Sequence, residues 1–446
     1  MFNIVFSADN NYIKYVGVLI NSIIKNTQTQ RSFKDFCARE YELIGYDKLD
    51  FEALSDEEKR EGYVFHILSE DISLENEQKL DALESKLCKT YPLKIKIYKN
   101  LGLDFGRIGS LGWGEGRNFT TYYRLVIPTL LRDCKTCLYL DVDMLINGDL
   151  RELFSLDLKG FALATVQNQP PFENVYNAGF LLFNLEIWRK EDLEQKCLMR
   201  LKEYPNQFDQ GALNAVIKNE NTLKIPLKYN FWLQTFQSDD YKIFQKEDFL
   251  RFKEHTQIIH YIRPKPWRSL MLWLQHSKNK VFFYQNIIDL WWECALKTPI
   301  FNKELQQKKI EMNNEFATNM HLYFNQLENT LKDQNSQIQT LQFHLNYGTA
   351  SSRLKSHLAY KLGEAMIDNS KSLLGYIRMP YVLSYIKDKH NKEQKQYQEK
   401  IKKNPKLKLP PLESYSDYKE SLKIKTTLSY KLGEALITAN SVRGGG

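Results

Sequence analysis

Long hydrophobic runs are absent from this chain of 446 residues. No uninterrupted apolar stretch reaches the roughly 18 residues that a membrane-spanning helix needs. The N-terminal segment has no basic region and no cleavage site, so we expect no signal peptide. These absences argue against an integral membrane protein and predict a cytoplasmic one.

Cysteine is also scarce, with six residues scattered along the chain. They do not form the dense framework of a small disulfide-rich protein, and they fit a reducing compartment. Cys134 and Cys137 have the spacing of half a zinc site, but no second pair of ligands matches them, so we do not expect zinc there. The remaining composition, 43% hydrophobic and 13% aromatic, is that of a globular protein with room for about two or three domains.

Charge is distributed unevenly between the two parts of the chain. Residues 346–446 contain 19 Lys and Arg against 9 Asp and Glu, whereas residues 1–345 contain 43 against 45. A near-neutral body with a basic C-terminal region indicates an anionic partner for that region, either the inner membrane surface or nucleic acid. The simpler interpretation is a solvated lysine-rich tail. Of the two partners we expect the membrane surface and not nucleic acid.

The most informative stretch is residues 138–146, where Asp141 and Asp143 interrupt an apolar run that then resumes. Such a run predicts a buried strand. Two carboxylates at the end of a buried strand are costly unless a positive group lies between them. Mg²⁺ and Mn²⁺ bind carboxylate oxygens and often share them with substrate phosphates. The stretch therefore indicates a metal site for a phosphorylated donor, and the alternative is that both aspartates cap a turn.

The first part of the chain predicts strands that alternate with helices, which indicates an α/β sheet. It opens with a strand at residues 3–7, a polar loop, and a helix at residues 13–25. Asp9 and Asn11 lie in that loop, where ligands collect in such sheets. The alternative is that they cap the helix. Residues 102–117 contain six glycines and predict a lid over a site.

Polar residues follow several predicted strands or begin predicted helices, and in a parallel sheet these positions can converge at one edge. The five clusters are Asp9 with Asn11, Asp141 with Asp143, Asn177, Asp209 with Gln210, and His260 with Lys265. Two aspartates and one histidine suit Mn²⁺, with Mg²⁺ as the alternative. Lys265 and the metal could together neutralise a diphosphate leaving group, helped by Arg124 from the preceding helix.

In this order, the motifs resemble those of the family 8 glycosyltransferases over residues 1–267. The motifs stand at residues 6–12, 123–125, 138–143, 176–179, 208–210, 260–261 and 265–267. The resemblance implies a GT-A fold, which is a Rossmann-like nucleotide-sugar domain. It also implies a UDP-sugar donor, Mn²⁺, and transfer with retention of the anomeric configuration.

The resemblance also implies a role for each matching residue. The metal would be bound by Asp141, Asp143 and His260. The nucleotide and its diphosphate would be held by Ala8, Asp9, Asn11, Tyr12, Arg124, Asp141, Val142 and Lys265. The donor sugar would be surrounded by Asn177, Asp209 and Gln210. Because retaining enzymes of this type have no evident nucleophile, we expect these last three residues to act by proximity and charge stabilisation.

The sugar and the acceptor are predicted from the kind of relative that the chain resembles. Relatives of this type decorate bacterial lipooligosaccharide, which favours galactose over glucose and a glycan or glycolipid acceptor. Two positions depart from the family pattern. Arg263 occupies a region where a glycine is usual, and Val166 with Gln167 replaces an acidic residue that some members use to recognise the sugar.

Two other functions remain open from the sequence. A haloacid-dehalogenase-type phosphatase also places Asp-x-Asp after an apolar strand, although that motif normally opens its domain. A membrane- or nucleic-acid-binding adaptor would instead use the basic C-terminal region. Compared with these, the family 8 glycosyltransferase explains more of the motifs.

The chain after residue 267 falls outside the resemblance. The predicted domains are a GT-A domain at 1–267 with an insertion at about 28–61, an aromatic-rich helical extension at 268–300, a coiled-coil-like segment at 301–346, and a basic region at 347–446.

Apolar residues at steps of three or four over 316–345 predict a helix that pairs with a second copy of the chain or packs on its own domain. The sequence YKLGEA occurs at 360–365 and 430–435, which predicts two amphipathic helices that dock on a membrane or a neighbouring subunit.

Overall fold

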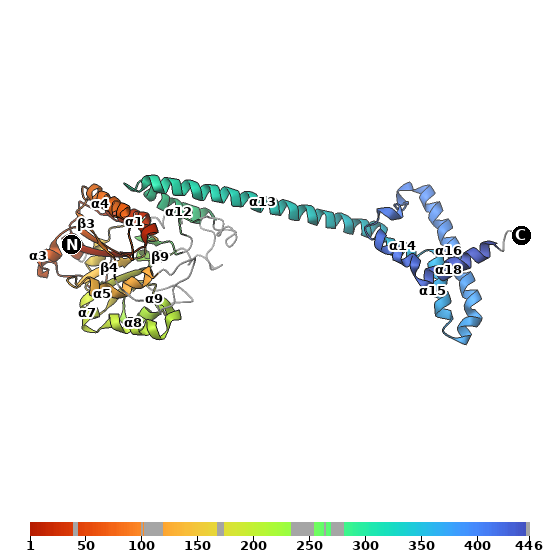
Figure 1. Cartoon of the computed structure of the whole chain (residues 1–446), viewed down its shortest axis with the longest axis horizontal. Coiled ribbons are helices and arrows are strands. Elements are labelled where there is room, and N and C mark those ends of the chain that lie inside the picture. The colour runs from red at the N-terminus through yellow and green to blue at the C-terminus, as the bar shows by residue number, and fades with distance from the viewer. Residues whose placement is uncertain are drawn as a thin grey trace. The chain divides into compact units, whose positions relative to one another are not determined.

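A computed structural model describes most of the chain, in two compact units. The described residues are 1–38, 43–99, 101, 119–166, 174–232, 254–262, 265–268 and 281–442. The first unit is Met1–Met320 and the second is His321–Gly446 (Figure 1). The predicted lid at 102–117, Arg263 and Gln167 lie outside the described residues. Among the described residues, no helix combines the length and apolar character needed to span a bilayer.

A seven-stranded sheet forms the centre of the first unit, in the order β3-β2-β1-β4-β7-β6-β8. Its strands are β1 (Phe2–Ser7), β2 (Tyr63–Leu68), β3 (Leu93–Tyr98), β4 (Thr136–Leu140), β6 (Leu163–Val166), β7 (Phe180–Asn184) and β8 (Leu223–Ile225). The first four neighbours in this order run parallel, whereas β7 runs antiparallel to both β4 and β6. The predicted α/β sheet is therefore present, but it is mixed and not wholly parallel.

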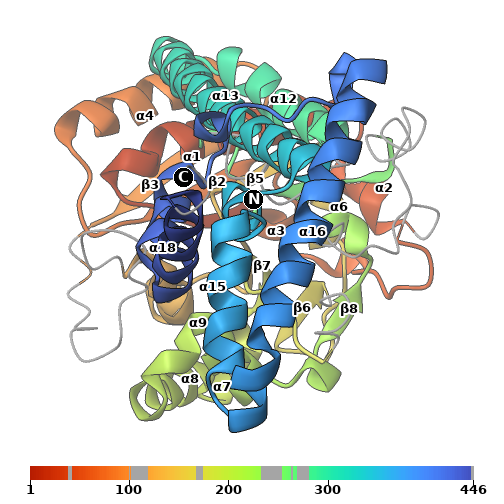
Figure 2. The same ribbon diagram turned by 90° about the vertical axis from the view of Figure 1, so that its right-hand side faces the viewer.

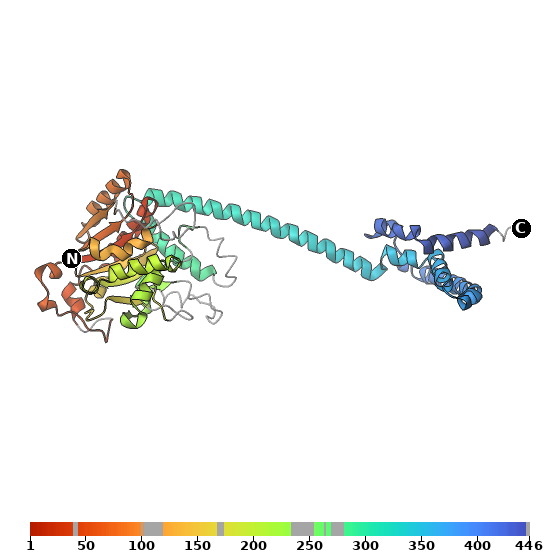
Figure 3. The ribbon, with the colours of Figure 1, turned by 60° about the horizontal axis from the view of Figure 1, so that its bottom comes forward.

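Helices cover both faces of this sheet, as Figures 1 and 3 show. One face carries α1 (Ile13–Asn26), α4 (Leu74–Leu87) and α12 (Val281–Leu296), and the other carries α5 (Ile127–Leu130), α7 (Leu185–Lys190), α8 (Leu193–Glu203) and α9 (Phe208–Val216). The helix α1 forms because its apolar residues recur at helical spacing, and Val16, Ile20 and Ile24 are buried against the sheet. Each face has its own hydrophobic core, so the sheet is covered on both sides.

The aspartate stretch does not form the single strand that its apolar residues predict. β4 ends at Leu140, and β5 (Met144–Ile146) belongs to a second sheet of order β5-β10-β9, with β9 (Phe231–Trp232) and β10 (Ile258–His260). The chain therefore turns at residues 141–143 and passes from one sheet to the other. Both carboxylates lie in this turn. Neither aspartate therefore has to enter the interior of a strand.

The segment predicted as an insertion folds onto the first unit through a buried arginine. It contains α2 (Phe33–Cys37) and α3 (Asp56–Lys59). Arg151, in α6 (Arg151–Phe154), is fully buried and pairs with Asp149 at 2.7 Å and with Glu61 at 3.2 Å. Its guanidinium also donates to the backbone carbonyl of Gln28 at 2.8 Å. These bonds tie both ends of the segment to the sheet domain.

The C-terminal part of the chain consists of helices and their connections, with no strand among the described residues after β10. α13 (Asn302–Tyr347) begins in the first unit and continues into the second. The second unit also contains α14 (Ala350–Lys355), α15 (Leu358–Asn369), α16 (Leu373–Lys403), α17 (Tyr418–Ser421) and α18 (Leu428–Val442). α15 lies between α18 and α16, as Figure 2 shows.

The two copies of the repeat pack against each other inside this unit. Their docking on a membrane or a neighbouring subunit stays a prediction. A Cβ on Gly363 of α15 would lie 1.6 Å from the backbone oxygen of Ser429, and one on Gly433 of α18 would lie 1.7 Å from that of Ala359. Ala359 and Ser429 occupy the same position in their copies, so the contact is reciprocal. The shared glycine lets the two helices approach closely, and this explains why the sequence occurs twice.

Candidate active site

Three potential metal ligands meet beside the turn between β4 and β5. The ligand atoms of Asp141, Asp143 and His260 all lie within 4.8 Å of one another, the one such group among the described residues. His260 Nε2 lies 3.3 Å from Asp143 Oδ1 and 3.7 Å from Asp141 Oδ2. The antiparallel pairing of β10 with β5 sets His260 opposite Met144, the residue after Asp143. The second sheet thus brings the distant histidine to the aspartates.

The protonation states of this group suit a divalent cation. Burial lowers the pKa of His260 to about 4, so its ring is neutral near pH 7. Burial opposes ionisation of Asp141, but nearby positive charges, above all that of Arg124 and also that of Lys265, outweigh it and lower the pKa of this carboxyl. The group therefore offers two carboxylates and one neutral imidazole. Hard and borderline cations such as Mn²⁺ and Mg²⁺ accept such oxygen-rich sets.

Lys265 provides a cation next to the potential metal ligands. Its ammonium pairs with the carboxylate of Asp143, and burial lowers the pKa of Lys265 to about 8. The following Trp267 stacks on Tyr15 of α1, with ring centroids 3.9 Å apart. This stacking anchors the loop of Lys265 to the helix that follows β1.

Arg124 joins the aspartate turn to the start of α9. Its Nη2 lies 2.8 Å from Asp141 Oδ1, and its Nε lies 3.0 Å from Asp209 Oδ2. The guanidinium also lies over the ring of Tyr139, 4.5 Å from its centroid. Arg124 is only 4% exposed and comes from the 3₁₀ segment Thr120–Val126, where we predicted a helix. A buried, fully paired guanidinium of this kind holds two carboxylates in fixed positions.

α9 begins at a strained residue, Phe208, which directly precedes Asp209 and Gln210. Phe208 has φ 53° and ψ −172°, a combination that costs a non-glycine residue about 1–3 kcal/mol. Burial raises the pKa of Asp209, although Arg124 opposes the shift. Gln210 Oε1 accepts hydrogen bonds from the backbone N–H of Ala178 at 3.1 Å and from Asn177 Nδ2 at 3.3 Å. The strained turn thus places Gln210 against the loop before β7 and Asp209 against Arg124.

Asn177 lies at the same edge of the sheet as Asp141, for a reason that we did not predict. We assumed parallel strands, but Asn177 precedes β7, which runs antiparallel to β4. The beginning of β7 therefore adjoins the end of β4, and Asp141 N–H donates to Gly179 O at 2.8 Å. The convergence was predicted correctly, but it depends on the direction of β7.

Asn230 is a buried site residue that the sequence interpretation missed. Its Nδ2 donates to Asn177 Oδ1 at 3.1 Å, and its Oδ1 lies 2.9 Å from His260 Nδ1. It lies between a 3₁₀ turn (Leu227–Tyr229) and β9, which begins at Phe231. The signal in the sequence that could have identified Asn230 was an amide side chain between two aromatic residues at the boundary of a strand.

The residues after β1 take positions that fit both of their predicted roles. The Asp9 carboxylate accepts from the backbone N–H groups of Asn11 at 2.9 Å and Tyr12 at 3.1 Å, so it caps the next turn. Ala8 is buried, and β1 runs parallel to β4 with Val5 opposite Tyr139, so both strands end at the same edge of the sheet. The loop after β1 thus lies beside the aspartate turn. Tyr12 makes an edge contact with Trp267, near Lys265.

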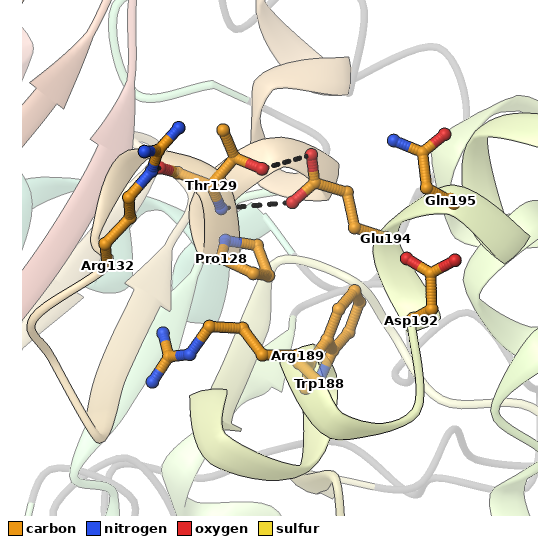
Figure 4. A pocket seen from close by; sticks show the side chains of 8 residues that line it. All are labelled: Pro128, Thr129, Arg132, Trp188, Arg189, Asp192, Glu194 and Gln195. Carbon is orange, nitrogen blue, oxygen red and sulfur yellow. Dashed lines mark hydrogen bonds between the residues drawn. The ribbon is translucent and has the colours of Figure 1, made fainter.

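A separate small pocket of about 240 Å³ lies between α5, α7 and α8 (Figure 4). The Glu194 carboxylate accepts from Thr129 Oγ1 at 2.9 Å and from Thr129 N–H at 3.1 Å, and so it caps the short helix α5. None of the site residues predicted from the sequence lines this pocket. We interpret its acidic group as structural.

Residues 3–271 match the model of glycosyl transferase family 8. The chain belongs to this family. Residues 275–446 match a second model, described as a domain of unknown function. Enzymes of family 8 use nucleotide-sugar donors and a divalent metal ion, and the group at Asp141, Asp143 and His260 has the chemistry to bind one. Family membership decides against the phosphatase and the adaptor as the main function.

The relatives that this family 8 glycosyltransferase matches include glycosyltransferases of bacteria. The chain is 25% identical to the lipopolysaccharide 1,3-galactosyltransferase of Salmonella typhimurium over 339 residues, which is 70% of this chain and 86% of the relative. It is 26% identical to a putative glycosyltransferase of Haemophilus influenzae over 333 residues, 69% of this chain and 87% of the relative.

Among solved structures, this glycosyltransferase is similar to the galactosyltransferase LgtC in complex with donor and acceptor sugar analogs. The TM-score is 0.47 at 21% identity, and the match covers 69% of this chain and all of LgtC. A second match is the glycosyltransferase GlyE of Streptococcus pneumoniae, with a TM-score of 0.45 at 22% identity over 72% of this chain and 65% of GlyE. The first unit has the GT-A fold that the motifs imply, followed by a helical C-terminal region.

Proposed function

We propose that this enzyme transfers a hexose, galactose in preference to glucose, from a UDP-sugar to a hydroxyl of a bacterial surface glycan. The transfer depends on Mn²⁺ and retains the anomeric configuration. The observation that carries this proposal is the meeting of two carboxylates, a neutral imidazole and Lys265 in one buried site. Asn177 and Gln210 reach that site through one hydrogen-bonded chain.

The metal is held by Asp141, Asp143 and His260 in this proposal. Two carboxylate oxygens and one imidazole nitrogen match the preferences of Mn²⁺ better than those of Mg²⁺, which takes oxygen ligands and retains water. When bound, the ion supplies positive charge to the diphosphate leaving group. Lys265 adds a second cation on the Asp143 side of the group.

The nucleotide lies along the loop after β1 and the aspartate turn. Ala8, Asp9, Asn11 and Tyr12 contact the uridine, and Val142 borders it from the turn. The parallel pairing of β1 and β4 supports this arrangement, because both loops leave the same edge of the sheet. The ion pair with Arg124 holds the Asp141 carboxylate in position.

The donor sugar lies against Asn177, Asp209 and Gln210. Arg124 pairs with Asp209 and opposes the rise in its pKa that burial causes. An ionised Asp209 near the anomeric carbon would stabilise the positive charge that develops there. Gln210 is oriented by the Ala178 N–H, and its amide nitrogen is then directed away from that contact. These residues act by charge and proximity and form no covalent bond to the sugar.

The similarity to a lipopolysaccharide 1,3-galactosyltransferase over 86% of that relative supports galactose as the sugar and a lipooligosaccharide as the acceptor. Such an acceptor is a glycolipid, so we place the enzyme in the cytoplasm, peripherally on the inner face of the membrane. The excess of basic residues in 346–446 supports contact with anionic lipid. No nucleic acid takes part.

The helix α13 supports pairing with a second copy of the chain. Its apolar residues between 320 and 345 recur mostly at steps of three or four. Several of them are exposed: Tyr323, Leu327, Leu331, Ile338, Leu341 and Leu345. Gln334 is polar within the same series, and a polar residue there would set the register. A monomeric mass in solution at every concentration would contradict this pairing.

Measuring UDP release from a panel of UDP-sugars with Mn²⁺ tests the donor and the reaction together. We expect UDP-galactose to be turned over fastest, and excess chelator to abolish turnover. Asp141→Asn retains the size of the side chain but removes its negative charge, so it should weaken metal binding and reduce transfer about 100-fold or more. Glu75→Gln, an exposed carboxylate of α4, is the control and should have wild-type activity. Full activity of Asp141→Asn, or phosphate release from an aryl phosphate alone, would overturn the proposal.

A further inference from the structure

A chain of hydrogen bonds connects the metal ligand His260 to the residues assigned to the sugar. It runs from His260 Nδ1 to Asn230 Oδ1 at 2.9 Å, and from Asn230 Nδ2 to Asn177 Oδ1 at 3.1 Å. It continues from Asn177 Nδ2 to Gln210 Oε1 at 3.3 Å. Asn230 is the central link, and neither motif nor family role assigned it a function.

The direction of every bond in this chain is set by two backbone N–H groups, which can only donate. Gly179 N–H donates to Asn177 Oδ1 at 2.9 Å, so that atom is the amide oxygen. The Asn230 atom facing it must then be the nitrogen. Ala178 N–H donates to Gln210 Oε1 at 3.1 Å, so that atom is also an amide oxygen. It therefore accepts from Asn177 Nδ2.

The histidine tautomer follows from this polarity. Asn230 turns its oxygen to His260, so the ring carries its proton on Nδ1. Its Nε2 then has a free lone pair, and this atom faces Asp143 Oδ1 at 3.3 Å and Asp141 Oδ2 at 3.7 Å. A metal ligand needs this lone pair, and second partners of this kind orient ligating histidines.

We propose that Asn230 is a positioning residue that selects the metal-binding tautomer of His260 and aligns Asn177 with it. The inference rests on the proposed metal role of Asp141, Asp143 and His260. Asn230 and His260 are 0% and 2% exposed, so water does not readily replace the amide. Because the same amide contacts Asn177, it also connects the metal side of the site to the sugar side.

Two substitutions separate the two contacts of Asn230. Asn230→Ala removes both contacts. The N–H at His260 Nδ1 then has no acceptor in Asn230, and its proton is no longer held on Nδ1. Asn230→Asp retains an oxygen that accepts from His260 Nδ1, but it offers no donor to Asn177 Oδ1. We therefore expect alanine to weaken Mn²⁺ binding about 10- to 100-fold and aspartate to leave it within about threefold of wild type. The aspartate variant should instead raise KM for the donor sugar.

Mn²⁺ binding to the full chain, with and without UDP, is measured by the loss of the free-ion signal in electron paramagnetic resonance. ¹⁵N-histidine NMR reports independently which nitrogen of His260 carries the proton. Asn21→Ala is the matched control, because Asn21 is a buried amide that donates to Thr298 Oγ1 at 3.3 Å. It should lower stability without changing Mn²⁺ affinity.

The outcomes distinguish the inference from the function on which it rests. If the wild type binds no Mn²⁺ in either condition, the proposed metal site and this inference both fall. If the wild type binds Mn²⁺ and a folded Asn230→Ala binds it equally well, only the inference falls. An Asn230→Asp variant that binds Mn²⁺ as weakly as Asn230→Ala would also overturn it. An oxygen that accepts from His260 Nδ1 would then not be sufficient to restore Mn²⁺ binding.

Discussion

At the scale of single residues, the aspartates and the histidine were recognisable from the sequence and Asn230 was not. Asp141 and Asp143 interrupt an apolar run, and a charge there has few structural uses. Asn230 has no such local signature, since asparagine is common at turns. Its importance comes from residues far away along the chain, His260 and Asn177, that meet it only in the fold.

Gly179 lies against two of the proposed metal ligands, Asp141 and His260, and leaves no room for a side chain. A Cβ there would lie 2.4 Å from His260 Cε1 and 2.7 Å from Asp141 Oδ2. We expect Gly179→Ala to push these ligands apart, weaken Mn²⁺ binding at least about tenfold, and cost about 1–3 kcal/mol of stability. Titration with Mn²⁺ and chemical denaturation measure the two effects.

The control for this prediction is Gly17→Ala in α1. Its Cβ would lie 2.6 Å from the ring of Phe301, so the crowding is similar but involves no metal ligand. This variant should lose stability and bind Mn²⁺ normally. If Gly179→Ala also binds Mn²⁺ normally, Asp141 and His260 adjust to the added methyl group more easily than the distances indicate.

His66 predicts a specific loss of stability in acid. It lies in β2 at 1% exposure, 3.0 Å from both Asn3 Oδ1 and Tyr98 OH, and burial lowers its pKa to about 3. The unfolded chain, with the ordinary value of 6.5, binds a proton first as the pH falls. Stability is therefore intact above pH 6.5 and lost between 6.5 and about 3, by about 2 kcal/mol near pH 5.

Denaturation of wild type and His66→Gln as a function of pH isolates this loss, because all other groups are common to both proteins. The wild type should be destabilised more steeply than the variant below pH 6.5. His321→Gln, an exposed histidine of α13, should retain the wild-type slope. Equal slopes for all three proteins would show that His66 does not resist protonation.

At the scale of elements, hydrophobic patterning predicted the strands and helices of the first unit but not their partners. β1 (Phe2–Ser7) covers the strand predicted at 3–7, and α1 (Ile13–Asn26) covers the helix predicted at 13–25. The aspartate stretch was interpreted as one strand, because its two apolar halves look continuous. Only pairing of the second half with β10 shows that it belongs to another sheet.

The packing of α15 on α18 yields a prediction for the repeat. The backbone of each helix touches the glycine of the other, so any Cβ must force them apart. We expect Gly433→Ala to destabilise the pair by about 1–3 kcal/mol. Hydrogen exchange of the amides in both helices should then become faster, whereas the exposed neighbour substitution Glu434→Ala should leave it unchanged. Unaltered exchange in Gly433→Ala would contradict the close contact.

At the scale of the whole molecule, the charge difference between the two parts predicts how the enzyme meets its acceptor. The basic excess of 346–446 should bind the full chain to vesicles that contain anionic lipid. Raising the salt from about 0.1 to about 1 M shortens the screening length from roughly 10 to 3 Å and should release the protein. Co-sedimentation with vesicles measures the binding, and vesicles of neutral lipid are the control.

Two results would contradict this prediction. Binding to neutral and anionic vesicles alike would indicate an apolar contact, and no binding to either would leave the basic region as a solvated surface. Binding to a DNA oligonucleotide with equal strength would show that the charge is not selective for lipid.

The sequence by itself determined the family, the α/β class of the first unit, and the residue types of the site. These follow from local patterns, since apolar periodicity and short motifs survive without knowledge of distant contacts. The tertiary structure alone decided the split of the aspartate stretch between two sheets, the antiparallel β7 that carries Asn177 to the site, and the pairing of the two repeats. It also decided the place of Asn230, because hydrogen-bond partners and buried glycine contacts depend on which distant segments the fold brings together.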